Sequence, residues 1–265
     1  MGWEVYPNGS YLRTRKFDDP LQGACDSCIC LASLSSMGWT GSQFYDNPNP
    51  VTNIGGYKYY QFKFYPNNIE KTVRVSERLC LDGGTQRFAS SREANELWPS
   101  LYEKAYAAFI NNGRNNVLPG IDTFVMSGVN FGKNGVMTLL ELSRRPCQEK
   151  SVSNFTSGSA AYTYIENLSP TSKPVIAWSP PGNGTADGIT YNHTYSVLGV
   201  YNSSHIILRD PMRGAVEPSG SYVLRNGTLT GGITDINLGD ITDGIFAYDK
   251  EKFKERFFKL AFATQ

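Results

Sequence analysis

Apolar and polar positions follow two different patterns along the chain, and the change falls near its middle. In the first half, the apolar residues of 91–109 recur every three or four positions and fall on one face of a helix. Ser90 and Glu93 have the spacing of a capping box, which predicts that this helix begins near Ser91.

Shorter patterns predict the other elements of the first half. The run that begins at Cys28 predicts a short helix that stops at Gly38. Residues 39–56 are rich in Gly, Asn and Pro, which predicts a loop. Residues 57–65 alternate and are aromatic, so they predict a strand, with 72–79 as its partner.

The second half consists mainly of short apolar and β-branched runs. They predict strands at 174–179, 194–201, 205–210 and 244–249. One helix is predicted at about 135–145, and an amphipathic helix at 250–261 closes the chain. A helix-rich half followed by a strand-rich half predicts an α+β protein with two lobes, 1–130 and 131–265.

Composition and charge narrow the class of protein. The chain has 265 residues, of which 40% are hydrophobic and 18% charged, and these values exclude a disordered protein. A net charge of +1 gives no electrostatic reason to expect nucleic acid as a partner. No apolar run approaches the length of a membrane span, so we expect no membrane-spanning segment.

Cysteines and glycosylation sequons bear on the compartment. Five cysteines leave at least one thiol unpaired within the chain. A zinc site is not favoured, because only the distant Cys80, Cys147 and two histidines remain to complete the ligands of the cysteines at 25–30. The sequons favour a secreted or lumenal protein, with the cytoplasm as the alternative; they lie at Asn8, Asn154, Asn167, Asn183, Asn192, Asn202 and Asn226.

The chain has only two histidines, so histidine-dependent catalysis must use one of them. His205 lies in the apolar run HIIL, where a lone histidine is more often a packed or edge residue. His193 lies where a predicted strand begins, after a long Gly- and Pro-rich loop. This position suits a cleft, and we predict that His193 is the catalytic base.

A nucleophile and a third residue can be placed in the same way. Cys28 lies at the start of a predicted helix, where the backbone dipoles lower a thiol pKa. Buried thiols or a disulfide, for example between Cys25 and Cys80, are the alternative for this segment. Asp210 follows a strand and can accept the imidazole N–H, although an Asp before Pro also forms plain turns.

These segments resemble those of papain-superfamily cysteine peptidases. QGACDSC (22–28) resembles their nucleophile segment, NHTYSVLGV (192–200) the histidine segment, and ILRDP (207–211) the segment of the orienting Asn. YQFKFYPNNIEKTVRVSERL, ELWPSLYEKAYAAF and GIFAYDKEKFKERFFKL are most similar to the calpain protease core. Ile29, Asp26 and Asp210 depart from this pattern, since Trp, Gly and Asn are usual there.

The resemblance implies a two-lobed cysteine endopeptidase whose Cys-bearing lobe precedes the His/Asp-bearing lobe. Cys28 would attack a peptide carbonyl, His193 would act as base, and Asp210 would hold the imidazole. Gln22 and the Cys28 backbone N–H would form the oxyanion hole, and water would then hydrolyse the thioester. Two alternatives stay open: a transglutaminase-like acyl transferase and an inactive module that binds peptides.

The resemblance also implies calcium, which calpain cores bind through an acidic loop in the second lobe. Calcium needs about six to eight oxygen ligands, usually with several carboxylates among them. After Asp210 the chain offers Glu217 and then no acidic residue before Asp235. We therefore expect no cofactor, and activity that does not depend on calcium.

Overall fold

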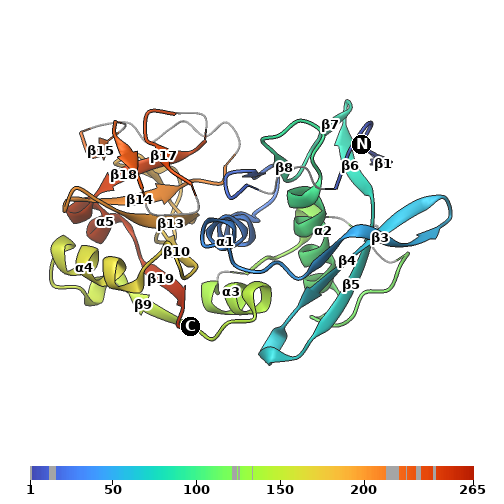
Figure 1. The fold of residues 1–265 in the computed structure, drawn as a ribbon, viewed down its shortest axis with the longest axis horizontal. Coiled ribbons are helices and arrows are strands. Elements are labelled where there is room, and N and C mark those ends of the chain that lie inside the picture. The colour runs from blue at the N-terminus through green and yellow to red at the C-terminus, as the bar shows by residue number, and fades with distance from the viewer. Residues whose placement is uncertain are drawn as a thin grey trace.

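The computed structural model of the chain describes residues 2–11, 16–120, 124, 126–132, 134–212, 221–224, 226–230, 234–240 and 243–265. Helices and strands are mixed in it, which confirms the predicted α+β class (Figure 1). The helices are α1 (Cys28–Trp39), α2 (Trp98–Asn111), α3 (Gly135–Ser143), α4 (Gly158–Leu168) and α5 (Lys250–Arg256), with short 3-10 turns η1 (Pro66–Asn68), η2 (Met126–Gly128) and η3 (Val152–Asn154).

The strands form one large sheet and several small ones. The strands of the first half are β1 (Gly2–Val5), β2 (Pro20–Leu21), β3 (Asp46–Ile54), β4 (Tyr57–Phe64), β5 (Lys71–Ser76), β6 (Arg78–Asp82), β7 (Thr85–Gln86) and β8 (Ser90–Ser91). Those of the second half are β9 (Cys147–Ser151), β10 (Val175–Trp178), β11 (Thr185–Ala186), β12 (Ile189–Thr190), β13 (Thr194–Tyr201), β14 (His205–Arg209), β15 (Val223–Leu224), β16 (Thr228–Leu229), β17 (Ile236–Asn237), β18 (Ile245–Asp249) and β19 (Lys259–Ala263).

The large sheet is antiparallel and has the strand order β15-β18-β14-β13-β10-β19-β9. Successive residues of β13 point to opposite faces. Tyr195 and Val197 enter the core cluster shared with α4 and α5, whereas Ser196 faces α1 and donates a hydrogen bond to the Ala32 carbonyl at 2.8 Å. The sheet thereby fixes α1 against the beginning of β13.

The first half builds its core around α2. On β4, Phe62 and Phe64 are fully buried, and the Phe62 ring lies 4.8 Å from the ring of Tyr102 on α2. Figure 1 shows α1 between this region and the large sheet. The start of α1 therefore lies where the two parts of the chain meet.

Most of the predicted elements are present. The strands predicted at 57–65, 174–179, 194–201, 205–210 and 244–249 are observed as β4, β10, β13, β14 and β18, and the helix predicted at 135–145 is α3. The strand predicted at 72–79 is observed as β5, which ends at Ser76, and the last two residues of that range begin β6. The helix at Cys28 is also confirmed, but it runs through Gly38 to Trp39. Gly38 serves packing here, since an added Cβ would lie 3.0 Å from the Cα of Phe17.

The loop predicted at residues 39–56 is wrong over half of its length. Residues 46–54 form β3, an edge strand that pairs antiparallel with β4. Pro and Asn are tolerated because an edge strand needs ladder hydrogen bonds on one side only. An irregularity between Asn47 and Thr52 also interrupts the pairing.

The long helix of the first half begins later than the capping-box signal predicted. α2 starts at Trp98 with a proline in its first turn, whereas Ser90 and Ser91 form β8. The Ser91 hydroxyl accepts a hydrogen bond from the Glu93 backbone N–H at 3.0 Å. These polar residues therefore form a local turn after β8 and do not start the helix.

The closing helix predicted at 250–261 is wrong in its second half. α5 ends at Arg256, and residues 259–263 form β19, which pairs with β10 on one side and β9 on the other. Leu260 and Ala261 are both fully buried. A short apolar run is compatible with either a helix or a strand, and here the pairing with two neighbouring strands makes the segment a strand.

Candidate active site

The turn before α1 is pressed against the backbone of residues 87–88. An added Cβ on Gly23 would lie 2.3 Å from the Phe88 carbonyl oxygen, so only glycine fits. The Ala24 N–H donates to the Arg87 carbonyl at 2.9 Å. The chain then enters α1 at Cys28, which is half-buried, with Ser27 in the N-cap position. Cys28 therefore lies at a helix start, as predicted.

A buried carboxylate of α2 holds this turn in place. Glu103 of α2 is fully buried and accepts hydrogen bonds from the Ser27 hydroxyl, the Cys25 thiol at 3.1 Å and the Ala89 N–H at 2.8 Å. Burial raises the pKa of Glu103, while these donors act in the opposite direction. The network holds the residues before Cys28 in one conformation.

The backbone of His193 is held by Ser179, which directly follows β10. The Ser179 N–H donates to the His193 carbonyl at 3.0 Å, and the His193 N–H donates to the Ser179 hydroxyl at 3.0 Å. The ring of Tyr195 stands nearly perpendicular to the imidazole, with centroids 4.9 Å apart. His193 is only 4% exposed, so these contacts leave its ring little freedom.

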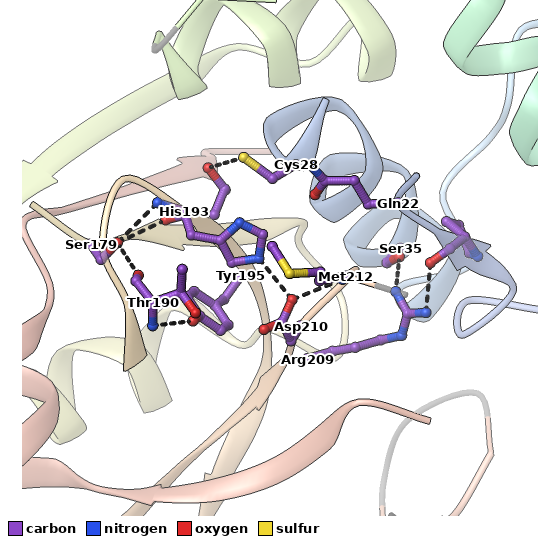
Figure 2. A network of polar contacts seen from close by, with 12 residues as sticks. Gln22, Cys28, Ser35, Ser179, Thr190, His193, Tyr195, Arg209, Asp210 and Met212 are labelled. Carbon is purple, nitrogen blue, oxygen red and sulfur yellow. Dashed lines mark hydrogen bonds and ion pairs between the residues drawn. The ribbon is translucent and has the colours of Figure 1, made fainter. Parts of the chain in front are cut away.

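Asp210 meets the imidazole from the next strand of the sheet. Its Oδ1 lies 2.7 Å from His193 Nε2 and also accepts the Met212 N–H at 2.8 Å. Gly244, at φ +72°, lets the chain pass so close that an added Cβ would lie 2.5 Å from the Asp210 carbonyl oxygen. The remaining ring nitrogen, Nδ1, points toward Cys28 (Figure 2).

Cys28 completes the arrangement from the other side. Its sulfur lies 3.7 Å from the Thr194 hydroxyl oxygen. Burial raises the pKa of the Cys28 thiol, but the hydrogen bond and charge of His193 and the hydrogen bonds of Thr194 outweigh it, and the pKa is lowered. Burial lowers the pKa of His193, yet Asp210 and Cys28 raise it to about 10. Around neutral pH this arrangement favours a thiolate–imidazolium pair.

Gln22 lies beside Cys28 (Figure 2). Its side-chain Nε2 donates to the Cys25 carbonyl at 2.7 Å, which leaves the second N–H of the amide for another acceptor. Its backbone N–H donates to the Pro211 carbonyl at 2.6 Å. The segment that carries Gln22 is therefore bonded directly to the segment that carries Asp210.

The structure thus brings together Gln22, Cys28, His193 and Asp210, and it keeps the second histidine apart. His205 lies in β14, where Ser204 hydrogen-bonds its Nδ1 at 2.8 Å and burial lowers its pKa. All five cysteines are free thiols, so the alternative of a Cys25–Cys80 disulfide is not observed.

The residues that support the predicted ones were not apparent from the sequence. Thr194, Tyr195 and Ser179 contact Cys28 or His193, and Glu103 anchors the turn. One signal was available: Tyr195 is two residues from His193 and lies on the same side of the strand. Ser179 and Glu103 are distant in sequence, and no local pattern points to them.

A cavity of about 380 Å³ opens beside this arrangement. Its lining includes Cys28, His193 and Thr194, and it extends to the segment Ser127–Gly132. In the part of the chain that the structure describes, no group of three or more His, Cys, Asp or Glu side chains is arranged to hold a metal ion. Glu217, weighed above as a calcium ligand, lies outside the described residues.

Comparison with known proteins identifies the family. A family model described as "Calpain family cysteine protease" matches residues 7–222, well over half of the chain. The chain belongs to the calpain family of cysteine proteases. This confirms the predicted class, a calpain-like cysteine peptidase, and it fits the Cys-then-His order of the site.

Individual calpains match at low identity. The chain is 27% identical to calpain-8 of Homo sapiens over 217 residues, which is 77% of this chain and 29% of that protein. It is 26% identical to calpain clp-1 of Caenorhabditis elegans over 187 residues, 68% of this chain and 22% of that protein. The chain therefore spans less than a third of these calpains.

No helix among the described residues is long and apolar enough to cross a membrane.

The lowered pKa of Cys28 leads to a first prediction. Cys28 should react with iodoacetamide at pH values where an ordinary cysteine, with a pKa of about 8.5, is protonated and unreactive. The rate should fall as the pH falls through the lowered thiol pKa. Thr194→Val removes a donor to the sulfur and should slow alkylation at pH 6 about two- to tenfold, the scale of one hydrogen bond.

Thr194→Ser is the matched control, because it keeps the hydroxyl and should keep the parent rate. Peptidase activity should also decline above a pH of about 10, where His193 loses its proton and the ion pair is lost. Equal rates for the Val and Ser variants at every pH would show that the hydroxyl does not stabilise the thiolate.

Proposed function

We propose that this chain hydrolyses peptide bonds in protein substrates through a Cys–His–Asp triad. The observation that carries the proposal is the position of His193, with Nε2 2.7 Å from Asp210 and its other ring nitrogen toward Cys28 (Figure 2). Asp210 fixes the tautomer and favours the charged ring, so the sulfur is available as a thiolate.

This geometry supports the following reaction. The Cys28 thiolate attacks the substrate carbonyl, and the Cys28 backbone N–H and Gln22 Nε2 donate to the oxyanion. The imidazolium of His193 protonates the leaving amine, and the same ring then removes a proton from water as it attacks the thioester. Hydrolysis regenerates the thiolate–imidazolium pair.

The proposal includes a two-lobed arrangement, with residues 1–130 as the Cys-bearing lobe and 131–265 as the His- and Asp-bearing lobe. It is supported by the division of the core. One cluster of buried residues is drawn wholly from residues 152–262, whereas another centres on α1, α2 and the β3-β4-β5 sheet. In this arrangement Cys28 and His193 face one another from opposite walls of the cleft.

An unfolded protein substrate tests the function directly. Incubation with the parent chain should produce cuts whose new termini carry the mass of one added water, and Cys28→Ser should produce none. Products joined to an added amine would favour a transglutaminase-like transferase instead. No product and no labelling of Cys28 by a thiol reagent would favour an inactive peptide-binding module.

The lack of a calcium requirement is a further part of the proposal. Buried Arg209 of β14 donates to the Ser35 hydroxyl at 2.7 Å and to the Asp18 and Pro20 carbonyls at 2.6 and 2.8 Å. The Trp39 indole N–H donates to the Leu198 carbonyl at 2.7 Å. These bonds join the two walls of the cleft through protein groups alone.

We therefore expect cleavage to survive a calcium chelator. The measurement compares initial rates with chelator, with added calcium and with added magnesium. Arg209→Lys keeps a charge but loses the forked geometry, so it should lower activity in a way that calcium does not rescue. Loss of activity on chelation, restored by calcium alone, would contradict this expectation.

We propose a secreted or lumenal location from the sequons, with the cytoplasm as the alternative. Mass spectrometry of natural material tests it through the glycans. Unmodified Asn at every sequon would count against secretion.

A further inference from the structure

Successive side chains of the turn before α1 point alternately to two opposite sides. Cys25 and Ser27 point inward, since both hydrogen-bond the buried carboxylate of Glu103. Asp26 and Cys28 alternate with them, and Asp26 is exposed while Cys28 is half-buried. Both line the cavity of about 380 Å³. Asp26 therefore lies two residues before the nucleophile, in the wall of the cavity where a substrate would lie.

The other titratable or charged side chains among the described lining residues, apart from the thiol of Cys28, have partners. His193 lies against Asp210, and Lys259 is paired with Glu149 at 2.6 Å. Among the described residues, none forms a hydrogen bond or an ion pair with the side chain of Asp26, so no positive partner compensates this carboxylate.

Much of the remaining cavity wall is apolar. Its side chains include those of Ile29, Val129, Phe131 and Trp178, all mostly buried. Such a wall suits the methylene stem of a long side chain whose charged end reaches solvent. A cavity that combines an uncompensated carboxylate with an apolar wall complements a lysine or arginine side chain of a substrate and disfavours a glutamate or aspartate side chain.

Resting on the proposed peptidase function, we propose that the cleft selects peptides with a lysine or arginine beside the scissile bond and that Asp26 binds the cationic end. The effect is moderate because Asp26 is exposed, and exposed ion pairs correspond to about two- to fivefold in affinity or rate. The selectivity should weaken with added salt, because solvent screens an exposed pair.

Matched peptides test the selectivity. In an otherwise constant sequence, Lys, Gln or Glu is placed in turn at each of the four positions around the cut, and kcat/KM is measured. At one position the parent should prefer Lys to Glu by about fivefold or more, since one charge is attracted and the other repelled. Asp26→Asn should lower this ratio toward one, and Asp26→Lys should invert it.

Asp82→Asn is the control, because Asp82 is an exposed carboxylate outside this cavity and its loss changes the net charge equally. It should leave the Lys/Glu ratio unchanged. A parent that cleaves the Lys, Gln and Glu peptides equally at every position would overturn the inference and leave the proposed peptidase function intact.

A second measurement does not require peptidase activity. Cys28 is modified with 2-aminoethyl methanethiosulfonate, a cation, and with 2-sulfonatoethyl methanethiosulfonate, an anion, and the extent at Cys28 is read by mass spectrometry. Asp26→Asn should lower the cation-to-anion rate ratio about two- to fivefold, whereas Asp82→Asn should not. An unchanged ratio would overturn the role of Asp26 even in a chain that cleaves no peptide.

Discussion

Replacing His193 with alanine is expected to reduce peptidase kcat/KM by about 10⁴-fold or more, the scale seen when a member of a nucleophile–base pair is removed. Without the imidazolium, the Cys28 thiol loses the hydrogen bond and the charge that lower its pKa. The leaving amine also loses its proton donor. The measurement is the cleavage rate of an unfolded protein, together with the iodoacetamide rate at pH 6, and both should fall.

The second histidine supplies the control. His205 is half-buried in β14 and hydrogen-bonded to Ser204, so His205→Ala should cost some stability and leave the cleavage rate of the folded protein near that of the parent. A thermal unfolding curve shows whether each variant is folded. Activity retained in folded His193→Ala and lost in folded His205→Ala would overturn the assignment of the base.

The residues proposed to act directly were all predictable, because each carries a reactive group at a recognisable chain position. Cys28 begins a helix, His193 precedes a strand and Asp210 follows one. With only two histidines in the chain, the choice of base was narrow. The helix start, the strand and its partner are present as expected. Their assembly into one site needed the fold, since it depends on how α1 packs against β13.

The supporting residues were not predictable, for a physical reason. Glu103 and Ser179 act through hydrogen bonds to residues 76 and 14 positions away in the chain, which local patterns do not encode. Glu103 and Lys104 are adjacent in the sequence, and charged residues on a helix are mostly exposed to solvent. In the structure both are buried, and Lys104 donates instead to the carbonyls of Ser76 and Arg78.

The wrong element boundaries have a common cause. At residues 46–54 and 259–263 the local composition was overruled by pairing with a neighbouring strand. β19 has partners on both sides, and it lies beside β10, whose following residue Ser179 holds His193. The misassigned C-terminal segment therefore contributes to the position of His193, the proposed catalytic base.

The second large effect is expected for Gln22. Gln22→Ala should lower kcat by about 10²-fold or more, the usual scale for losing one oxyanion donor, with little change in KM. The reason is that the oxyanion exists only in the transition state and the intermediate, so the ground-state complex loses little. Gln148→Ala, an exposed glutamine on β9, is the control and should keep the parent rate.

Gln22 has a second role that the same experiment separates. Its Nε2 also donates to the Cys25 carbonyl at 2.7 Å, so its loss could act by loosening the turn before Cys28. A loosened turn would change the iodoacetamide rate of Cys28, because alkylation forms no oxyanion and depends on the thiolate and its exposure. A fall in kcat at an unchanged alkylation rate therefore assigns Gln22 to the oxyanion hole. A parallel fall in both would show that Gln22 acts through the turn, and an unchanged kcat would remove it from the site.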